Sequence, residues 1–138
     1  MDQGEPHVKV MALDFGSART GVAVSDPTGT VARPLDVVEK VLSRPGLSRL
    51  VALIKSEQPE LVVVGMPLTL RGERGEQARA TEDFVEKLAA EIDVPVETYD
   101  ERFTTGLAQQ TPSASPEDAR AAAHLLSSYL EWSSAARA

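Results

Sequence analysis

The sequence predicts an α/β protein built on a mixed five-stranded sheet. In the first forty residues, short apolar runs alternate with turn residues, which is typical of neighbouring antiparallel strands. Beyond them, segments with helical periodicity alternate with short apolar runs, a pattern that indicates parallel strands beneath helices. The 138 residues fit one domain, with an N-terminal lead at 1–7 and a tail at 133–138 that we expect to be disordered.

The first three strands are expected to form an antiparallel meander. Residues 8–15 are mostly apolar, and a Gly-Ser pair supplies a turn before a second strand at 20–25. The sequence Asp-Pro-Thr-Gly at 26–29 favours a tight turn, so residues 30–38 are expected to return as a third strand. The short connections make these three strands antiparallel neighbours.

The remaining elements are expected to alternate. Residues 46–57 place apolar side chains at helical spacing, and 61–65 (LVVVG) has the continuous apolar character of a buried parallel strand. A second helix is predicted at 75–91, a fifth strand at 94–99 and a closing helix at 116–132. Sheets of this kind bind ligands beyond the carboxyl ends of their strands, so this edge is where a site is expected.

Composition sets limits on location and partners. The chain has no cysteine, and its N-terminus lacks the features of a signal peptide, so we expect a soluble cytoplasmic protein. The net charge of -7 argues against indiscriminate binding to nucleic acid, which normally requires a basic surface. However, ten of the 14 basic residues are Arg, the side chain best suited to bidentate phosphate contacts.

Three acids stand where they could converge on one point. Asp14 ends the first strand, Glu101 follows the fifth, and Asp118 opens the last helix. Carboxylates held close together repel one another unless a cation lies between them. Mg²⁺ or Mn²⁺ fits this role, because carboxylate oxygens are its preferred ligands. The pattern therefore favours a metal-dependent phosphodiesterase, in which divalent ions activate water and stabilise the leaving oxygen.

Each acid also has a structural interpretation. Asp14 could simply end its strand and accept hydrogen bonds from the turn. Asp118 lies three residues after Ser115, with Pro between them, which is a capping-box arrangement. Its neighbour Glu117 is an alternative third ligand. Glu101 could pair with a nearby basic side chain, although such exposed pairs contribute little.

Four segments in order along the chain carry a family resemblance: LDFGSARTGVAVSD, VVVGMPLTLRGERGEQA, YDERFTT and DARAAAHLLSSYLE. Together they resemble the YqgF/RuvX family, which is described as Holliday-junction resolvase homologues and as nucleases for the precursor of the small-subunit ribosomal RNA. The resemblance covers residues 8–131. It implies an RNase H-like fold and an acidic trio that binds Mg²⁺ or Mn²⁺, carried here by Asp14, Glu101 and Asp118.

Several basic or hydroxyl side chains near these motifs are candidates for contacts with the substrate phosphates. For any one of them alone, a solvated surface position is the alternative. Trp132 is expected to pack rather than to stack on bases, because aromatic residues make up only 4% of the chain. The candidates for nucleic-acid contacts are Arg19, Arg33, Arg71, Arg74, Arg102 and Thr104.

Two other functional classes remain open. A non-catalytic adaptor for nucleic acid, transcription or ribosomes could use the same fold, and it would bind without metal. An actin-like ATPase would share the first motif but needs two such domains to enclose a nucleotide. Within the nuclease interpretation, the substrate is branched DNA or ribosomal RNA precursor, and junction resolution would require a homodimer with two sites.

Overall fold

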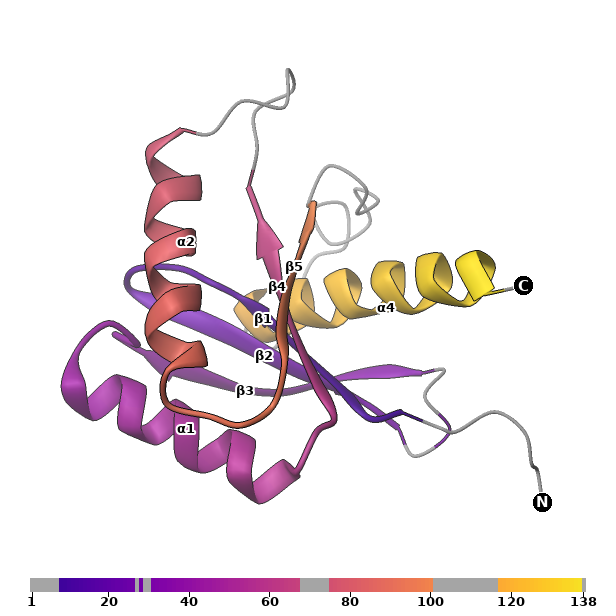
Figure 1. Ribbon diagram of the computed structural model, residues 1–138, viewed down its shortest axis with the longest axis horizontal. Coiled ribbons are helices and arrows are strands. Elements are labelled where there is room, and N and C mark those ends of the chain that lie inside the picture. The colour runs from indigo at the N-terminus through magenta and orange to yellow at the C-terminus, as the bar shows by residue number, and fades with distance from the viewer. Residues whose placement is uncertain (1–7, 27, 29–30, 68–74, 101–116, 138) are drawn as a thin grey trace.

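The computed structural model describes residues 8–26, 28, 31–67, 75–100 and 117–137. These residues form a five-stranded sheet with helices on both faces, α1 and α2 on one and α4 on the other (Figure 1). The elements are β1 (Val10–Asp14), β2 (Arg19–Ser25), β3 (Ala32–Glu39), α1 (Arg44–Glu57), β4 (Leu61–Met66), α2 (Glu76–Ala89), β5 (Val96–Asp100) and α4 (Glu117–Arg137).

The sheet has the mixed topology that the sequence predicts. Its strand order is β3-β2-β1-β4-β5. The meander of β1, β2 and β3 is antiparallel, whereas β4 pairs in parallel with both β1 and β5. The carboxyl ends of β1, β4 and β5 therefore meet at one edge of the sheet, which is the edge that ends at Asp14, Met66 and Asp100.

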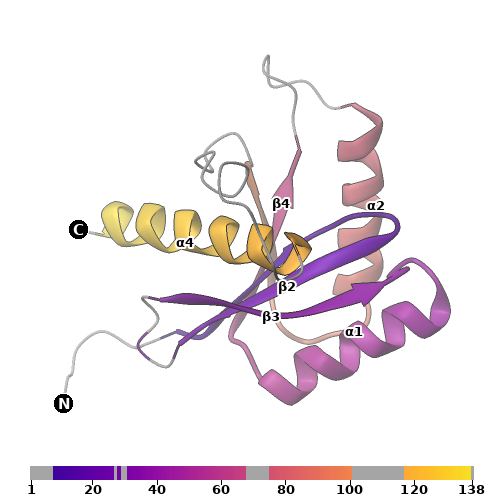
Figure 2. The ribbon, with the colours of Figure 1, turned by 180° about the vertical axis from the view of Figure 1, so that it is seen from behind.

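Alternation along β1 divides the core into two layers. Met11 and Leu13 are fully buried in a cluster with side chains of α1 and α2. Val10 and Ala12 point the opposite way, into a second cluster with Ala122 and other residues of α4. Figure 2 shows α4 lying across β2 and β3 on this second face, and it also contacts β1.

The start of α1 is fixed by local signals. The hydroxyl of Ser43 accepts a hydrogen bond from the backbone N–H of Gly46 at 3.1 Å, and Pro45 lies in the first turn. Gly46 is buried against the backbone carbonyls of Glu39 and Lys40, where a Cβ atom would clash. The helix begins at Arg44, two residues before the predicted start, because this cap precedes the apolar periodicity.

The last helix, α4, ends later than the sequence predicts. The helix continues to Arg137, whereas the apolar periodicity predicts an end at Trp132 and a disordered tail. The added segment SSAAR contains no Gly or Pro to stop the helix, and Ala and Arg are strong helix formers. The N-terminal lead at 1–7 lies outside the described residues.

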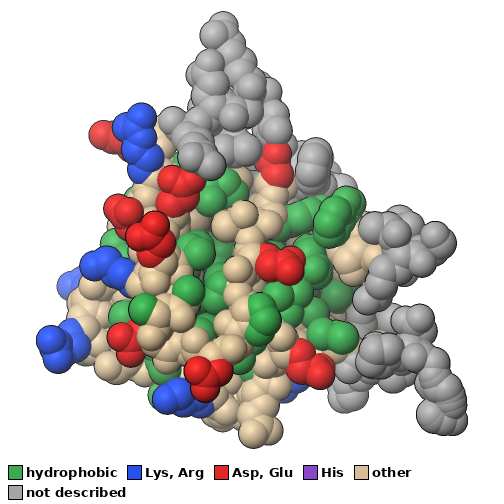
Figure 3. Space-filling view, viewed as in Figure 1, with side chains coloured by type: hydrophobic (Ala, Val, Ile, Leu, Met, Phe, Trp, Pro, Cys, Tyr) green, Lys and Arg blue, Asp and Glu red, His purple; other side chains and the backbone are tan. Residues whose placement is uncertain are grey.

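The described surface is of mixed charge. Figure 3 shows Lys and Arg side chains lying singly along the edge of the face that carries α1 and α2, with acidic side chains between them. Two ion pairs, Lys9–Glu57 and Arg49–Asp36, join neighbouring elements at 2.9 and 3.3 Å. Within the described ranges, no helix has both the length and the apolar character that a membrane span requires.

Candidate active site

Asp14 is the last residue of β1, the central strand of the sheet. Its neighbours Leu13 and Phe15 belong to the core beneath α1 and α2. Because successive side chains of a strand point to opposite faces, Asp14 lies on the face that α4 covers. The residue is half-buried. A rigid central strand therefore carries the first predicted ligand to the edge where a site is expected.

The residues after Asp14 hold it in place. The ring of Phe15 stacks on Phe84 of α2, with centroids 4.7 Å apart. The buried hydroxyl of Thr20 donates to the carbonyl of Gly16 at 3.3 Å and lies 3.4 Å from its N–H. A Cβ atom on Gly16 would clash with the carbonyl of Arg19. The hairpin between β1 and β2 is therefore closed tightly directly beyond the carboxylate.

Glycines flank Asp14 on both sides. Gly21 of β2 is its antiparallel partner. On β4, Val64 pairs with Leu13, so the next residue, Gly65, stands beside Asp14. Partners in register project to the same face, hence neither neighbouring strand places a side chain over the carboxylate. Glycine inside a strand commonly marks a position where a ligand comes close, and the apolar pattern of the sequence does not predict this pair.

The fifth strand distinguishes Glu101 from the acid before it. Tyr99 is buried in the α4 layer, so Asp100 projects to the opposite face from Asp14. Asp100 is the last described residue of this strand, and Glu101 lies outside the described residues. Alternation thus argues against Asp100 as a partner of Asp14 and leaves the assignment of Glu101 as a prediction.

The third predicted ligand belongs to the first turn of α4. The helix begins at Glu117, with Asp118 as its second residue, and the side chains of both lie outside the described residues. From Ala119 onward one side of α4, with Ala119, Ala122 and Leu126, is buried against the sheet face to which Asp14 points. The choice between the two acids, and the predicted cap at Ser115, therefore stay predictions.

Asp14, the predicted ligand whose side chain is described, suits a hard divalent cation. Asp14 offers carboxylate oxygens on a rigid strand, next to two buried glycines that add no side chain over it. No group of three His, Asp or Glu that could hold a metal occurs among the described side chains, a set that does not include Glu101 or Asp118.

The predicted phosphate contacts fall into two groups. Arg19 is exposed at the start of β2, directly beyond the hairpin that follows Asp14. Arg33 is exposed. It lies toward the opposite end of the sheet, because its partner Val24 pairs with Met11, three residues before Asp14. Val24 and Met11 belong to the core beneath α1 and α2, so Arg33 projects to the face opposite to Asp14, and the structure does not bring it to the predicted site. The candidates outside the described residues are Arg71, Arg74, Arg102 and Thr104.

Three aromatic side chains gather where β5 meets α4. Tyr99 meets Tyr129 edge-on, with ring centroids 5.5 Å apart, and its hydroxyl lies 2.9 Å from that of Ser128. Trp132 lies against both tyrosines, at 5.9 and 5.8 Å, yet it is 52% exposed. The sequence predicts packing for Trp132, and the structure shows packing on one side and exposure on the other.

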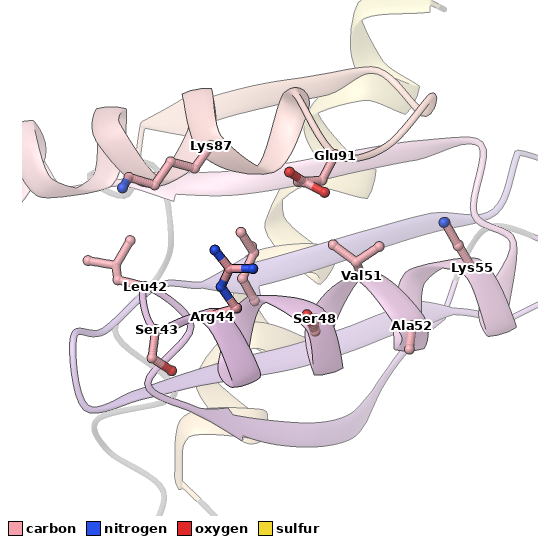
Figure 4. Close-up of a pocket in the computed structure, with 10 residues that line it drawn as sticks. Leu42, Ser43, Arg44, Ser48, Val51, Ala52, Lys55, Lys87 and Glu91 are labelled. Carbon is pink, nitrogen blue, oxygen red and sulfur yellow. The ribbon is translucent and has the colours of Figure 1, made fainter.

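A pocket of about 580 Å³ lies between α1 and α2, lined by both apolar and charged side chains (Figure 4). Leu42, Leu47 and Val51 form its apolar part, and Arg44 and Lys87 stand at one end. This pocket belongs to the helical layer opposite to the face of Asp14, so it is not part of the predicted catalytic site.

Comparisons with known proteins agree with these features. A family profile described as "RuvX: Holliday junction resolvase" matches residues 8–132. A protein of Roseiflexus sp. (strain RS-1) is 44% identical over 102 residues, covering 74% of this chain and 72% of its own length. A protein of Rubrobacter xylanophilus is 42% identical over 134 residues, covering 91% and 94%. Both carry the name "Putative pre-16S rRNA nuclease".

The fold has a solved counterpart. The structure of Thermus thermophilus RuvC in complex with a Holliday junction substrate superposes with a TM-score of 0.58 at 21% identity, covering 92% of this chain and 97% of that one. This likeness confirms the predicted RNase H-like fold. Because the family profile spans nearly the whole chain, the protein belongs to the family described as "RuvX: Holliday junction resolvase".

Proposed function

We propose that this protein is a divalent-metal-dependent endonuclease that cleaves phosphodiester bonds in structured nucleic acid. The observation that carries the proposal is the position of Asp14. It ends the central strand, at the edge where three parallel strands finish, on the face covered by α4, whose second residue is Asp118. The glycines on either side add no side chain over this carboxylate.

In this proposal Asp14, Glu101 and Asp118 are the protein ligands of Mg²⁺ or Mn²⁺. A bound divalent ion would lower the pKa of water and offset negative charge on the phosphate oxygens. The role of the polypeptide is to hold its carboxylates where they meet the scissile phosphate. The closed hairpin after Asp14 and the Phe15–Phe84 stack serve this purpose, because they prevent the end of β1 from moving.

The substrate that we favour is the precursor of the small-subunit ribosomal RNA, cleaved at its 5′ end. The relatives that are more than 40% identical over most of their length carry the name "Putative pre-16S rRNA nuclease", and the 5′ end is our own choice. The likeness to RuvC bound to a junction keeps branched DNA as the competing substrate. We place this activity in the cytoplasm, in keeping with a chain that has no cysteine.

The arginines near the site are proposed to hold the phosphates of the substrate. Arg19 is the described member of this group closest to Asp14 in the chain. Arg71, Arg74, Arg102 and Thr104 flank the other motifs. The guanidinium group is planar and binds phosphate in a bidentate manner, which positions the strand without reading its sequence.

A cleavage assay with a panel of substrates tests the proposal. The wild-type chain is incubated with Mg²⁺ or Mn²⁺ and with a four-way DNA junction, a flap and a structured ribosomal RNA precursor. We expect metal-dependent cleavage of the RNA precursor, and none in the presence of a chelator. If no substrate were cleaved with either metal, the nuclease assignment would be contradicted. Cleavage of the junction alone would correct only the substrate.

A further inference from the structure

The aromatic cluster of Tyr99, Tyr129 and Trp132 is built like a platform. Tyr99 and Tyr129 are 6% and 9% exposed, and they meet edge-on between β5 and α4. The hydroxyl of Tyr99 on β5 lies 2.9 Å from the hydroxyl of Ser128 on α4, and this contact joins the strand to the helix. The base of the cluster is thus held by two elements of the fold.

Trp132 is the exposed member of this cluster. Its ring lies 5.9 Å from Tyr99 and 5.8 Å from Tyr129, tilted by 50° and 45°. More than half of its surface remains exposed to solvent. An indole held against rigid neighbours can bind a flat ligand without first losing side-chain freedom, because its rotamer is already restricted.

The buried base of the platform, Tyr99, lies near the proposed catalytic residue. Gly65 of β4 pairs with Tyr99 and also stands next to Asp14. Asp14 and Tyr99 are therefore two strands apart on the same face, about 10 Å at the usual strand spacing. Between them the sheet carries a glycine, so no side chain of β4 separates the carboxylate from the aromatic cluster. Trp132 itself lies farther from the proposed metal site, because it follows Asp118 by 14 residues of α4, or about 21 Å along the helix axis at 1.5 Å per residue.

We propose that Trp132 stacks on an unpaired nucleobase of the substrate, at a distance from the bond to be cut. This inference rests on the proposed function and adds a substrate contact to it. Two exposed acids lie beside the cluster: Glu97, which shares a face of β5 with Tyr99, and Glu131, the neighbour of Trp132 in the chain. They would repel a phosphate, so the base is the part of a nucleotide that the platform can receive. Stacking on an aromatic side chain tolerates every base, since each has a π face.

The chain offers a direct probe, because Trp132 is its only tryptophan. The wild-type protein is titrated in Mg²⁺ buffer with single-stranded oligonucleotides, while tryptophan fluorescence and the anisotropy of a labelled strand are recorded together. We expect quenching that saturates in parallel with the anisotropy. An abasic strand of the same length should bind through its phosphates without quenching the fluorescence.

Substitutions separate stacking from packing. Trp132→Ala should weaken the binding of a base-bearing strand about tenfold and leave the abasic strand unaffected, and Trp132→Phe should restore most of the affinity. The matched control is Val31→Ala, which removes another exposed apolar side chain (58% exposed) near the start of β3 and should change nothing. Thermal melting of each variant checks that the fold persists.

The outcomes distinguish this inference from the proposed function. Binding by anisotropy with no change in fluorescence would overturn the stacking contact and leave the nuclease assignment intact. Equal weakening of both strands by Trp132→Ala would likewise overturn the stacking contact alone. If neither signal detected binding and no substrate were cleaved, the proposed function and the platform would both be wrong.

Discussion

The carboxylate of Asp14 is the group on which the proposed chemistry depends most. It is held by a central strand and followed by a closed hairpin, so its removal alters the site more than the fold. We predict that Asp14→Asn reduces cleavage at least about 100-fold, more than the loss of a group that merely supports a metal ligand. The thermal midpoint should change little, because the amide keeps the size of the side chain.

The control for this variant is Asp83→Asn on α2, which removes the same charge from an exposed helical position away from the site. Its rate should equal that of the wild-type chain. Equal rates for Asp14→Asn and the wild type would contradict the role of Asp14 as a ligand. Both rates are measured as initial velocities at saturating Mg²⁺.

Gly65 is predicted to be needed for its lack of a side chain. Replacement by Ala and then by Val adds increasing bulk between Asp14 and Tyr99 on the substrate face. We expect kcat/KM to fall about tenfold for Ala and further for Val, because small displacements of a bound substrate cost rate steeply. Gly65 is buried, so Val should also cost about 1–3 kcal/mol in the free energy of unfolding, and kcat/KM is therefore measured on the folded protein. Unchanged kcat/KM for Gly65→Val would show that the substrate does not cross this strip.

At the level of elements, two glycines have different predicted effects. Gly46 packs against the carbonyls before α1, and Gly16 closes the hairpin beyond Asp14. Either substitution by Ala forces backbone to move, and we predict a loss of about 1–3 kcal/mol in the free energy of unfolding. Ser48→Ala, at an exposed position of α1, should stay within about 0.5 kcal/mol of the wild-type value. Urea denaturation measures all three.

The two glycine variants should also separate stability from activity. Gly46→Ala lies in the layer opposite to the site, so its folded fraction should cleave at the wild-type rate. Gly16→Ala displaces the end of β1 and should lower the rate of the folded protein as well. An equal specific activity for both variants would contradict the role of the hairpin in positioning Asp14.

Most of the elements can be predicted from the sequence, because their signals are local. The LVVVG run predicts β4 within one residue, and the mixed topology follows from short connections in the first half and helical crossovers in the second. The predicted boundaries of α1 and α4 are wrong where a cap or plain helix propensity, rather than apolar periodicity, decides the ends.

The site can be predicted only in part. Asp14 at a strand end is predictable, since an acid that terminates an apolar run is a local feature. The glycines beside it are not, because Gly21 and Gly65 become its neighbours only through the pairing register. The exposed face of Trp132 likewise depends on where α4 crosses β5, which no local pattern contains. The positions of the Glu101 and Asp118 side chains remain predictions.

For the whole molecule, the net charge of -7 opposes the binding of nucleic acid, which is also negatively charged. A chain of this charge repels nucleic acid unless divalent ions offset its site carboxylates. We predict that Mg²⁺ strengthens binding of the wild-type chain at least about tenfold at constant ionic strength. The triple variant Asp14→Asn, Glu101→Gln and Asp118→Asn should bind with no dependence on Mg²⁺. If the protein were a metal-free adaptor, the wild-type chain would instead bind nucleic acid equally well with and without Mg²⁺. Anisotropy titrations distinguish the two cases.

Three carboxylates, from β1, the segment after β5 and the start of α4, are proposed to meet around divalent ions, and the whole mechanism depends on this meeting. A crystal soaked in Mn²⁺ and measured at the manganese absorption edge tests it most directly. We predict anomalous density beside Asp14, within coordinating distance of oxygens from Glu101 and Asp118. Density elsewhere, or an Asp14 carboxylate with no ion while the other two acids point away, would contradict it.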